Sequence, residues 1–232
     1  MREFRPTRFE ILPAVVKNLL IINGLVFLAQ ITIGDRYNFT DYFALHTFQS
    51  AMFKPWQFVT HMFMHGSFGH LLSNMFALWM FGSILENVWG PKKFLTFYLI
   101  CGLGAALCHM IVLYYEMQPI VEAFQRIPFE EQKELLYSNR FRLNEATLGA
   151  SGAVFGCLAA FGYLFPNTNI YIYFLFPLKA KWFVLIYAGL ELVQAVQNSA
   201  GDNVAHVAHL GGALVGILLV YYWNKTNKKT LF

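Results

Sequence analysis

Six long apolar segments constrain the fold of this chain more than any other feature of its sequence. Each approaches the roughly 20 apolar residues that a helix needs to cross a membrane. The segments are Val15–Ile33, Leu71–Trp89, Phe94–Tyr115, Thr147–Phe165, Trp182–Asn198 and Val204–Trp223. The sequence therefore predicts an all-α, polytopic membrane protein with six transmembrane helices. The fifth segment is the weakest, since it is short and contains Glu191, Gln194 and Gln197.

The composition favours the same class of protein and argues against others. Only 13% of the 232 residues are charged and 57% are hydrophobic, whereas a typical soluble domain is about 25% charged. The length suits one domain, so residues 1–232 are expected to form a single membrane domain. No cluster of Lys and Arg is large enough to follow a phosphate backbone, and nucleic acid is not an expected partner.

The cysteines lie inside the apolar segments, at Cys101, Cys108 and Cys157. An odd number of dispersed thiols argues against a disulfide framework and against a zinc site, which needs clustered ligands. They are expected to be small core residues. No metal or organic cofactor is expected.

Positive charges beside the apolar segments predict the orientation of the chain. Four clusters contain Arg2, Arg5 and Arg8; Lys92 and Lys93; Lys179 and Lys181; and Lys225, Lys228 and Lys229. With six spans, all four clusters fall on one side, so both termini are expected in the cytoplasm. Two outer connections are long. The aromatic-rich segment 34–65 is expected at the membrane interface, and segment 116–145 is expected to be a solvated loop with a short helix around Pro128–Tyr137.

Polar side chains are costly inside a bilayer, so their positions along the apolar segments are informative. In the predicted topology the second, fourth and sixth segments all begin at the outer face. His70 and Asn74 lie at the outer end of the second segment, Ser151 at that of the fourth, and His206 and His209 at that of the sixth. These side chains are therefore expected at one depth, where they can form a site.

The residue types at this depth fit one kind of chemistry. A serine hydroxyl becomes a nucleophile when a neighbouring histidine takes its proton. Ser151 falls in the first predicted turn of its helix, where the helix dipole favours negative charge. His70 and Asn74 are four residues apart, hence on one helix face, and both can donate hydrogen bonds to an oxyanion.

Glycines predict how the fourth and sixth segments pack. Gly152 and Gly156 on one, and Gly212 and Gly216 on the other, are spaced so that two helix backbones can approach closely in a membrane. We expect these glycines to face each other. Gly90, in a predicted cytoplasmic loop, is expected to tolerate alanine.

Three strings resemble the signature motifs of the rhomboid family of intramembrane serine proteases: HGSFGHLLSN (His65–Asn74), LGASGAVFG (Leu148–Gly156) and AHLGGALVG (Ala208–Gly216). The likeness in order and spacing extends over most of residues 10–224. It implies a rhomboid-like bundle of six helices in which Ser151 is the nucleophile and His209 the general base, without a carboxylate. It also implies that His70, Asn74 and the Ser151 N–H form an oxyanion hole, and that Gly149 and Gly152 shape the loop around the nucleophile.

The chain departs from some members of the family at two positions. Trp56-Gln57 stands where those members have Trp-Arg, which puts the contacts of that arginine in doubt. Phe155 stands where some have tyrosine; its ring can still stack on His209, but it offers no hydroxyl.

Each of these residues also has an alternative interpretation. Ser151 could be a packing serine of a small-residue motif, and His209 a satisfied interior histidine. His206 is interpreted as a supporting or interface residue, and His65 as structural or as a support for His70. Glu191, an ionisable group in a span, is interpreted as a hydrogen-bonded interior carboxyl in preference to a functional one.

The sequence thus predicts a rhomboid-type serine protease in the inner membrane of a bacterium, with single-span membrane proteins as substrates and lipid as its surroundings. One alternative is a rhomboid-like protein that binds membrane clients without cutting them. Another is a transporter lined by the outer histidines, for which Asn74 and Ser151 are poor ligands.

Overall fold

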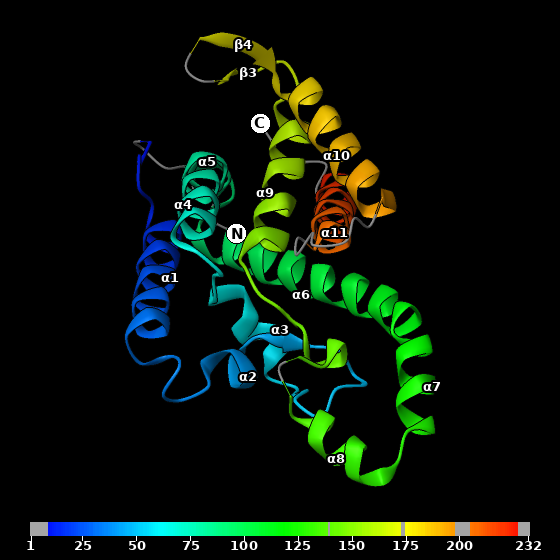
Figure 1. Cartoon of the computed structure of the whole chain (residues 1–232). Helices are drawn as coiled ribbons and strands as arrows, with labels where there is room; N and C mark the ends of the chain where they lie inside the picture. The colour runs from blue at the N-terminus through cyan, green and yellow to red at the C-terminus, as the bar shows by residue number, and fades with distance from the viewer. Residues whose placement is uncertain (1–8, 139, 173–174, 198–204, 227–232) are drawn as a thin grey trace.

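The computed structural model describes residues 9–138, 140–172, 175–197 and 205–226. Its helices are α1 (Ala14–Ile33), α2 (Phe39–Phe43), α3 (Gln57–Thr60), α4 (Phe68–Ala77), α5 (Ser83–Trp89), α6 (Pro91–Glu116), α7 (Gln118–Arg126), α8 (Phe129–Leu136), α9 (Ser151–Leu164), α10 (Ala180–Gln197) and α11 (His206–Thr226). Two short antiparallel pairs join β1 (Leu45–His46) to β2 (Ala146–Thr147) and β3 (Asn169–Ile172) to β4 (Phe176–Lys179). The fold is a mostly helical bundle with small additions at its ends (Figure 1).

Among the described residues, four helices are long and apolar enough to cross a membrane: Ala14–Ile33, Phe68–Trp89, Pro91–Glu116 and His206–Thr226. The second of these is continuous from α4 to α5 through a π-helical turn. The helix α9 has only 14 residues, and α10 does not meet the same criterion. The chain is therefore a membrane protein with several apolar helices, and the count of six spans stays a prediction.

The fourth predicted segment was wrong at its start. Helix α9 begins at Ser151 and not at Thr147, which lies in β2. The reason is Gly149, whose φ of 137° is incompatible with a right-handed helix. Nothing can be said of the predicted ends Asn198 and Val204, which lie outside the described residues, as do Arg2, Arg5, Arg8, Lys228 and Lys229.

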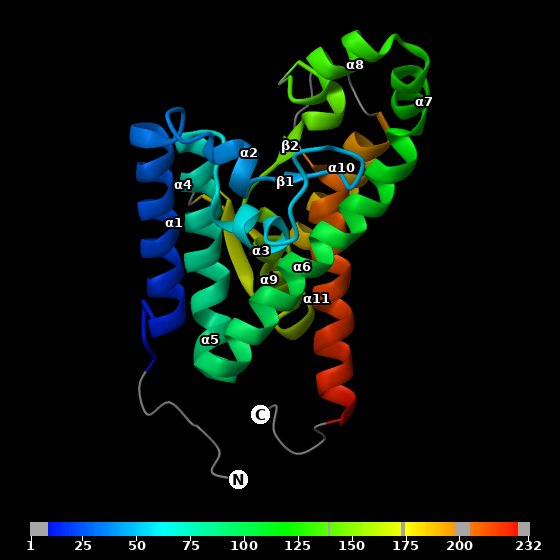
Figure 2. The ribbon, with the colours of Figure 1, turned by 90° about the horizontal axis from the view of Figure 1, so that it is seen from below.

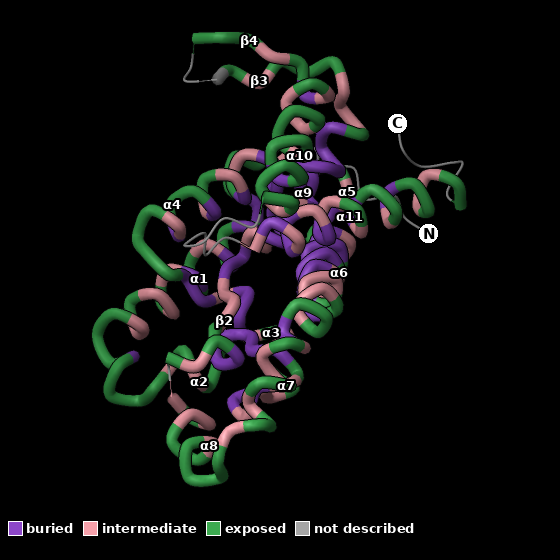
Figure 3. Tube along the Cα trace, turned by 45° about the vertical axis from the view of Figure 1, so that its right-hand side comes forward, coloured by how far each residue is buried: buried purple, intermediate pink, exposed green. Residues whose placement is uncertain are grey.

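Helix α9 lies at the centre of the bundle, between α4–α5 on one side and α10–α11 on the other (Figure 1). Most of its residues are buried, from Gly152 to Gly162, and the tube in Figure 3 shows this burial continuing into α6 and α11. Burial on all sides is what an apolar helix without a polar face predicts. Ser151 is therefore the first residue of a helix that is mostly buried.

A buried carboxylate fixes the first helix against the second. Glu86 on α5 accepts hydrogen bonds from the backbone N–H groups of Val15 (2.9 Å) and Val16 (2.8 Å) in the first turn of α1. Those N–H groups have no partner within their own helix, and a negative charge at a helix N-terminus is stabilising. The acidic side chain thus supplies the cap that Pro13, the residue preceding the helix, cannot.

The segment between α1 and α4 is folded against the chain that precedes Ser151. Strand β1 pairs with β2, and the Gly149 N–H donates to the carbonyl of His61 (2.9 Å). Gln57 is fully buried, and its amide group bonds to the backbone of Asp41 and Met52. At the position where some family members have arginine, a buried glutamine therefore holds this segment together.

One further expectation for the connections is settled. The short helix predicted around Pro128–Tyr137 is confirmed as α8 (Phe129–Leu136). Helix α7 and the β3–β4 hairpin were not predicted. Figure 2 shows α7 and α8 at the end of the bundle opposite to the α5–α6 junction and the last turns of α11.

The predicted glycine contact between the fourth and sixth segments is confirmed. A Cβ atom at Gly212 would collide with the carbonyl oxygen of Gly152, and one at Gly216 would lie 2.8 Å from that of Gly156. On the other side of α9, a Cβ at Gly152 would lie 2.5 Å from the Cβ of Ala105 on α6. Helix α9 thus packs closely against α11 on one side and α6 on the other, with no side chain at the contacting glycines. The described cysteines are all free, with Cys101 and Cys157 buried and Cys108 half-buried.

The expectation for Gly90 was wrong. This glycine joins α5 to α6 with a φ of 80° and a ψ of 163°, a region that is nearly restricted to glycine. Alanine at this position would be strained, so Gly90 is unsuitable as a neutral control. A Cβ atom at Gly24, in the middle of α1, would have no neighbouring atom within 4 Å, so this glycine serves that purpose instead.

Gly212→Val is expected to lower both thermal stability and activity. The added side chain must separate α9 from α11, which costs about 1–3 kcal/mol as overpacking. A displacement of about 1 Å at a reacting pair can lower a rate about a hundredfold. Thermal unfolding in detergent and a cleavage assay measure the two effects.

The matched control is Gly24→Ala, which fills open space within a helix and is expected to leave both quantities unchanged or to raise stability by about 0.5–1 kcal/mol. A Gly212→Val protein that melts and cleaves like wild type would show that the two helices tolerate separation.

Candidate active site

Ser151 is the first residue of α9, at the point where the chain enters the centre of the bundle. The preceding backbone is fixed by the Gly149 hydrogen bond to His61 and by the β1–β2 pair. The N–H groups of a first helical turn have no partners within the helix and point toward its N-terminal end. Ser151 therefore lies where unpaired donors and the helix dipole can stabilise a negative charge.

His209 is the residue that reaches Ser151. It lies one turn into α11, and its Nε2 atom is 2.8 Å from the Ser151 Oγ atom. The Phe155 ring, one turn after Ser151, lies parallel to the His209 ring with centroids 4.3 Å apart and an interplanar angle of 7°. The predicted stacking of Phe155 on His209 is confirmed. Ser151 and His209, which the sequence indicates as nucleophile and base, are thus in hydrogen-bond contact, and the Phe155 ring packs on one face of the imidazole.

Glu191 lies behind His209 and completes a chain of hydrogen bonds. Its Oε2 atom is 2.9 Å from Nδ1 of His209 and 2.7 Å from Nδ1 of His206. All three residues are buried. The interpretation of Glu191 as a hydrogen-bonded interior carboxyl was correct, but the sequence did not show that one of its partners is the histidine beside Ser151. His206 is the second hydrogen-bond partner of the Glu191 carboxylate.

Among the described residues, these three form a group that could hold a metal ion, with one ligand atom from each lying within 4.8 Å of the others. A metal ion on His209 Nδ1 would leave the imidazole proton on Nε2, which could then no longer accept the Ser151 proton. Both hydrogen bonds to Glu191 would also be lost. The donor set therefore suits a hydrogen-bonded network more than a metal centre.

His70 borders the serine from the side of α4. A Cβ atom built on Gly149 would lie 3.0 Å from His70 Nε2 and 3.5 Å from Ser151 Oγ, so both atoms border the same small space. The Ser67 side chain caps α4 by accepting from the His70 N–H (3.1 Å). The absence of a side chain at Gly149 is what leaves room for the His70 ring beside the nucleophile.

Asn74 lies one turn further along α4 and is buried. Its Nδ2 atom donates to the His70 carbonyl (3.0 Å), which fixes the amide group beside the His70 residue. The roles of His70 and Asn74 as oxyanion donors stay predictions, as do the catalytic roles of Ser151 and His209.

His65 was interpreted as structural or as a support for His70, and it contacts the His70 ring edge to face at 5.1 Å. Its backbone is held by Gln30 on α1, which donates to the His65 carbonyl and accepts from the His65 N–H. Burial, together with repulsion from His70, lowers the pKa of His65 to about 4, so its ring is neutral at physiological pH. The link to α1 gives His70 a rigid neighbour.

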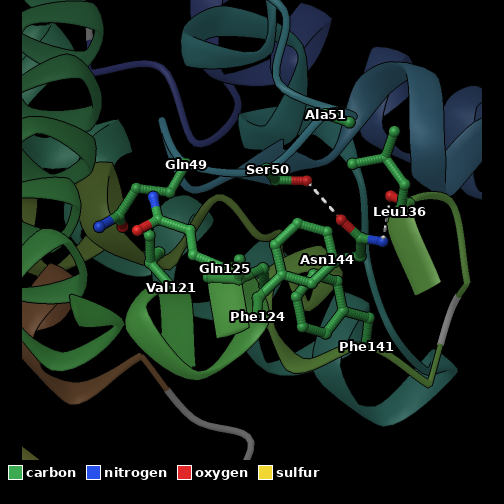
Figure 4. A pocket seen from close by; sticks show the side chains of 10 residues that line it. Gln49, Ser50, Ala51, Val121, Phe124, Gln125, Leu136, Phe141 and Asn144 are labelled. Carbon is green, nitrogen blue, oxygen red and sulfur yellow. Dashed lines mark hydrogen bonds between the residues drawn. The ribbon is translucent and has the colours of Figure 1, made fainter. Parts of the chain in front are cut away.

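A pocket lies elsewhere in the described chain. It has a volume of about 290 Å³ and is lined by segment 49–51, by α7 and by Leu136, Phe141, Leu143 and Asn144, and none of the residues of the serine site lines it (Figure 4). Ser50 and Asn144 hydrogen bond across its wall at 2.6 Å. The serine site is therefore recognised from its hydrogen bonds and not from a cavity.

Comparisons with known proteins agree with the motifs. The family model described as the Rhomboid domain matches residues 52–225. Rhomboid protein 1, mitochondrial, of Saccharomyces cerevisiae is 30% identical over 167 residues, which cover 72% of this chain and 41% of that protein. Rhomboid-like protein 11, chloroplastic, of Arabidopsis thaliana is 31% identical over 224 residues, covering 88% of this chain and 66% of that protein.

A bacterial relative is also similar. Rhomboid protease AarA of Providencia stuartii is 28% identical over 223 residues, which cover 89% of this chain and 71% of that protein. The chain spans less than two thirds of the length of the mitochondrial and chloroplastic relatives, at 41% and 66%.

Gly149→Ala is expected to damage the site. Its φ of 137° would strain an alanine by about 1–3 kcal/mol, and the new methyl group would press against the His70 ring. A loss of that size lowers the melting temperature by about 2–4 °C per kcal/mol in a chain of this length. The reaction of Ser151 with a fluorophosphonate should slow as well, because the backbone before the serine must move.

Gly69→Ala, next to His70, is the matched control and should behave like wild type, because its Cβ would meet only the Ser67 hydroxyl, at an ordinary contact distance of 4.0 Å. Equal melting temperatures and labelling rates for the two variants would contradict the account of Gly149.

Proposed function

Because this chain belongs to the rhomboid family, we propose that it is an intramembrane serine endopeptidase that uses Ser151 as nucleophile and His209 as general base. The observation that supports this most directly is the 2.8 Å contact between Ser151 Oγ and His209 Nε2, located at the N-terminus of a buried helix. Apart from an activated serine, few roles require a hydroxyl, an imidazole and free helix N–H groups at one point.

The proposed reaction has two halves. In the first, His209 Nε2 takes the Ser151 proton while Oγ attacks the carbonyl carbon of the scissile bond, and the proton then passes to the departing amine. In the second, His209 takes a proton from water, which attacks the acyl-enzyme, and the proton returns to Ser151 Oγ as the acid product leaves. Neither half requires a metal ion or an organic cofactor.

The oxyanion formed in each half needs hydrogen-bond donors. The Ser151 N–H is one candidate. His70 is a second, because its Nε2 atom borders the space beside Ser151 Oγ. Asn74 is a third, since one of its N–H bonds is used on the His70 carbonyl and an amide nitrogen carries two.

The proposed substrates are single-span membrane proteins, cut near the outer face of the membrane. A peptide bond inside a helix is shielded and already hydrogen-bonded, so a substrate must unwind before Ser151 can reach it. Glycine or other small residues near the scissile bond would ease that unwinding. The helices that are long and apolar enough to cross a membrane support this proposal, since single-span substrates lie in the same lipid layer.

For its location we propose the inner membrane of a bacterium, with both termini in the cytoplasm as the positive clusters predict. The similarity to Rhomboid protease AarA of Providencia stuartii supports a bacterial membrane. Relatives whose names state mitochondrial and chloroplastic origin make an organelle membrane the alternative.

Two other functions are less well supported. A rhomboid-like protein that only binds membrane clients needs neither a nucleophile nor a base, yet here the two are in contact. A transporter lined by histidines would present its polar groups to a pathway, whereas Glu191, His206 and His209 are buried and bonded to one another.

Ser151→Ala and His209→Ala are each expected to abolish cleavage of single-span substrates reconstituted with the enzyme, with little change in the melting temperature. The double variant should be no worse than either single one, because the two residues act as a unit. Fluorophosphonate labelling supplies a second measurement, and both single variants should lose it. A Ser151→Ala protein that still cleaves at a comparable rate would refute the assignment of the nucleophile.

Asn74→Ala and His70→Ala are expected to lower kcat more than they raise KM, since an oxyanion exists only in the transition state. Loss of one donor typically costs about 3 kcal/mol, or on the order of a hundredfold in kcat. Steady-state kinetics on one purified substrate separates the two constants. An effect confined to KM would assign these side chains to substrate binding. Leu72→Ala, which changes an exposed side chain of the same helix, is the control.

A further inference from the structure

We propose that Glu191 is a positioning residue of the active site, which makes the arrangement a Ser151–His209–Glu191 relay and not a dyad, with His206 holding the carboxylate in place. The inference rests on the proposed function of Ser151 and His209. It goes beyond the family resemblance, which implies a dyad without a carboxylate and assigns no role to the helix that contains Glu191.

The hydrogen bonds define one continuous path. Ser151 Oγ contacts His209 Nε2 at 2.8 Å, and the opposite ring atom, Nδ1, contacts Glu191 Oε2 at 2.9 Å. An ionised carboxylate can only accept hydrogen bonds. His209 must then carry its proton on Nδ1, which leaves Nε2 free to accept the Ser151 proton. Glu191 thus selects the one neutral tautomer in which His209 can act as a base.

The Glu191 carboxylate also stabilises the positive charge that forms on His209 during the reaction. When the proton moves from Ser151 Oγ to His209 Nε2, the imidazole becomes an imidazolium with a proton on each nitrogen. Its Nδ1 proton stays on His209 and faces the negative charge of Glu191, which itself takes up no proton. In an apolar bundle a positive ring without such a partner would be costly to form.

His206 explains how Glu191 can be held at this point. The His206 Nδ1 atom is 2.7 Å from the same Oε2 atom that His209 contacts. A buried carboxylate is costly unless donors surround it, and two ring N–H groups on one oxygen meet part of that need. Because His206 and His209 are three residues apart on α11, a single helix presents both donors to Glu191 on α10.

The His209 ring is fixed from a third direction. Phe155 covers one face of the ring at 4.3 Å, while Glu191 and Ser151 hold its two nitrogen atoms. Rotation of the imidazole would break at least one hydrogen bond and the stacking. The geometry therefore assigns the orientation of the base to Glu191 and Phe155 together.

The decisive variant is Glu191→Gln, which keeps the shape of the side chain and removes its negative charge. In the full chain in detergent, kcat should fall at least about a hundredfold; neutralising the carboxylate of a serine–histidine–aspartate triad lowers kcat by about 10⁴-fold. The value of KM should change little, and the rate of fluorophosphonate labelling at Ser151 should fall by the same factor as kcat. Glu191→Asp, which restores a carboxylate, should recover part of the loss.

Two matched controls separate positioning from folding. Gln194→Ala changes an exposed side chain one turn away on the same helix and should leave kcat, labelling and melting temperature unchanged. Glu86→Gln neutralises another buried carboxylate, whose partners are backbone N–H groups of α1. It should lower the melting temperature and leave the kcat of the folded enzyme near that of wild type, the reverse of Glu191→Gln.

A third readout does not depend on activity. Nitrogen NMR of histidine-labelled protein, assigned with His209→Ala, should show the Nδ1–H tautomer for His209 in wild type and a shift toward the Nε2–H tautomer in Glu191→Gln. A Glu191→Gln protein with kcat and labelling within about threefold of wild type, or with an unchanged tautomer, would overturn the proposal. A wild type with the Nδ1–H tautomer that cleaves no membrane substrate would instead refute the proposed function alone.

Discussion

The backbone contact between α9 and α11 is the constraint on which the site depends. In lipid there is no hydrophobic drive between helices, so close van der Waals packing must hold them together. Gly152 faces Gly212 and Gly156 faces Gly216 without side chains between them. Since Ser151 precedes the first of these glycines and His209 lies one turn before its partner, the same contact that packs the helices brings the hydroxyl to the imidazole. Larger residues at these positions would hold the two groups apart.

A second constraint comes from outside the bundle. The chain enters α9 through Gly149, whose backbone conformation and hydrogen bond to His61 set the direction of the helix. The helical segment that contains His61 is in turn held by buried Gln57 and by the β1–β2 pair. Residues far from Ser151 in the sequence thus fix the position of its backbone, which is a requirement for donors that must be in place before charge develops.

Much of this could be predicted from the sequence, because the signals involved are local. Apolar length indicated the helices, and paired glycines indicated the α9–α11 contact. The convergence of Ser151 with His209 followed from placing their segments in a common topology. The start of α9 could not be predicted from hydropathy, since Leu148 belongs to the apolar segment and only the conformation of Gly149 prevents the helix from beginning earlier. The partners of Glu191 could not be predicted either. They lie 15 and 18 residues away on another helix, and their contact depends on how α10 is rotated against α11.

The two buried glutamates show why a carboxylate in a membrane helix cannot be interpreted from its burial alone. Glu86 and Glu191 are both almost inaccessible, at 3% and 6% exposure, and both satisfy their charge with two N–H donors. The donors on Glu86 are backbone groups, which cannot gain or lose a proton, so that carboxylate can only fix one helix to another. The donors on Glu191 are imidazoles, whose protonation state can change. A carboxylate in contact with such groups alters which proton they hold and how they are oriented. The two carboxylates are buried to a similar extent, so it is the chemistry of their partners that distinguishes a charge that can only support the fold from one that can take part in a reaction.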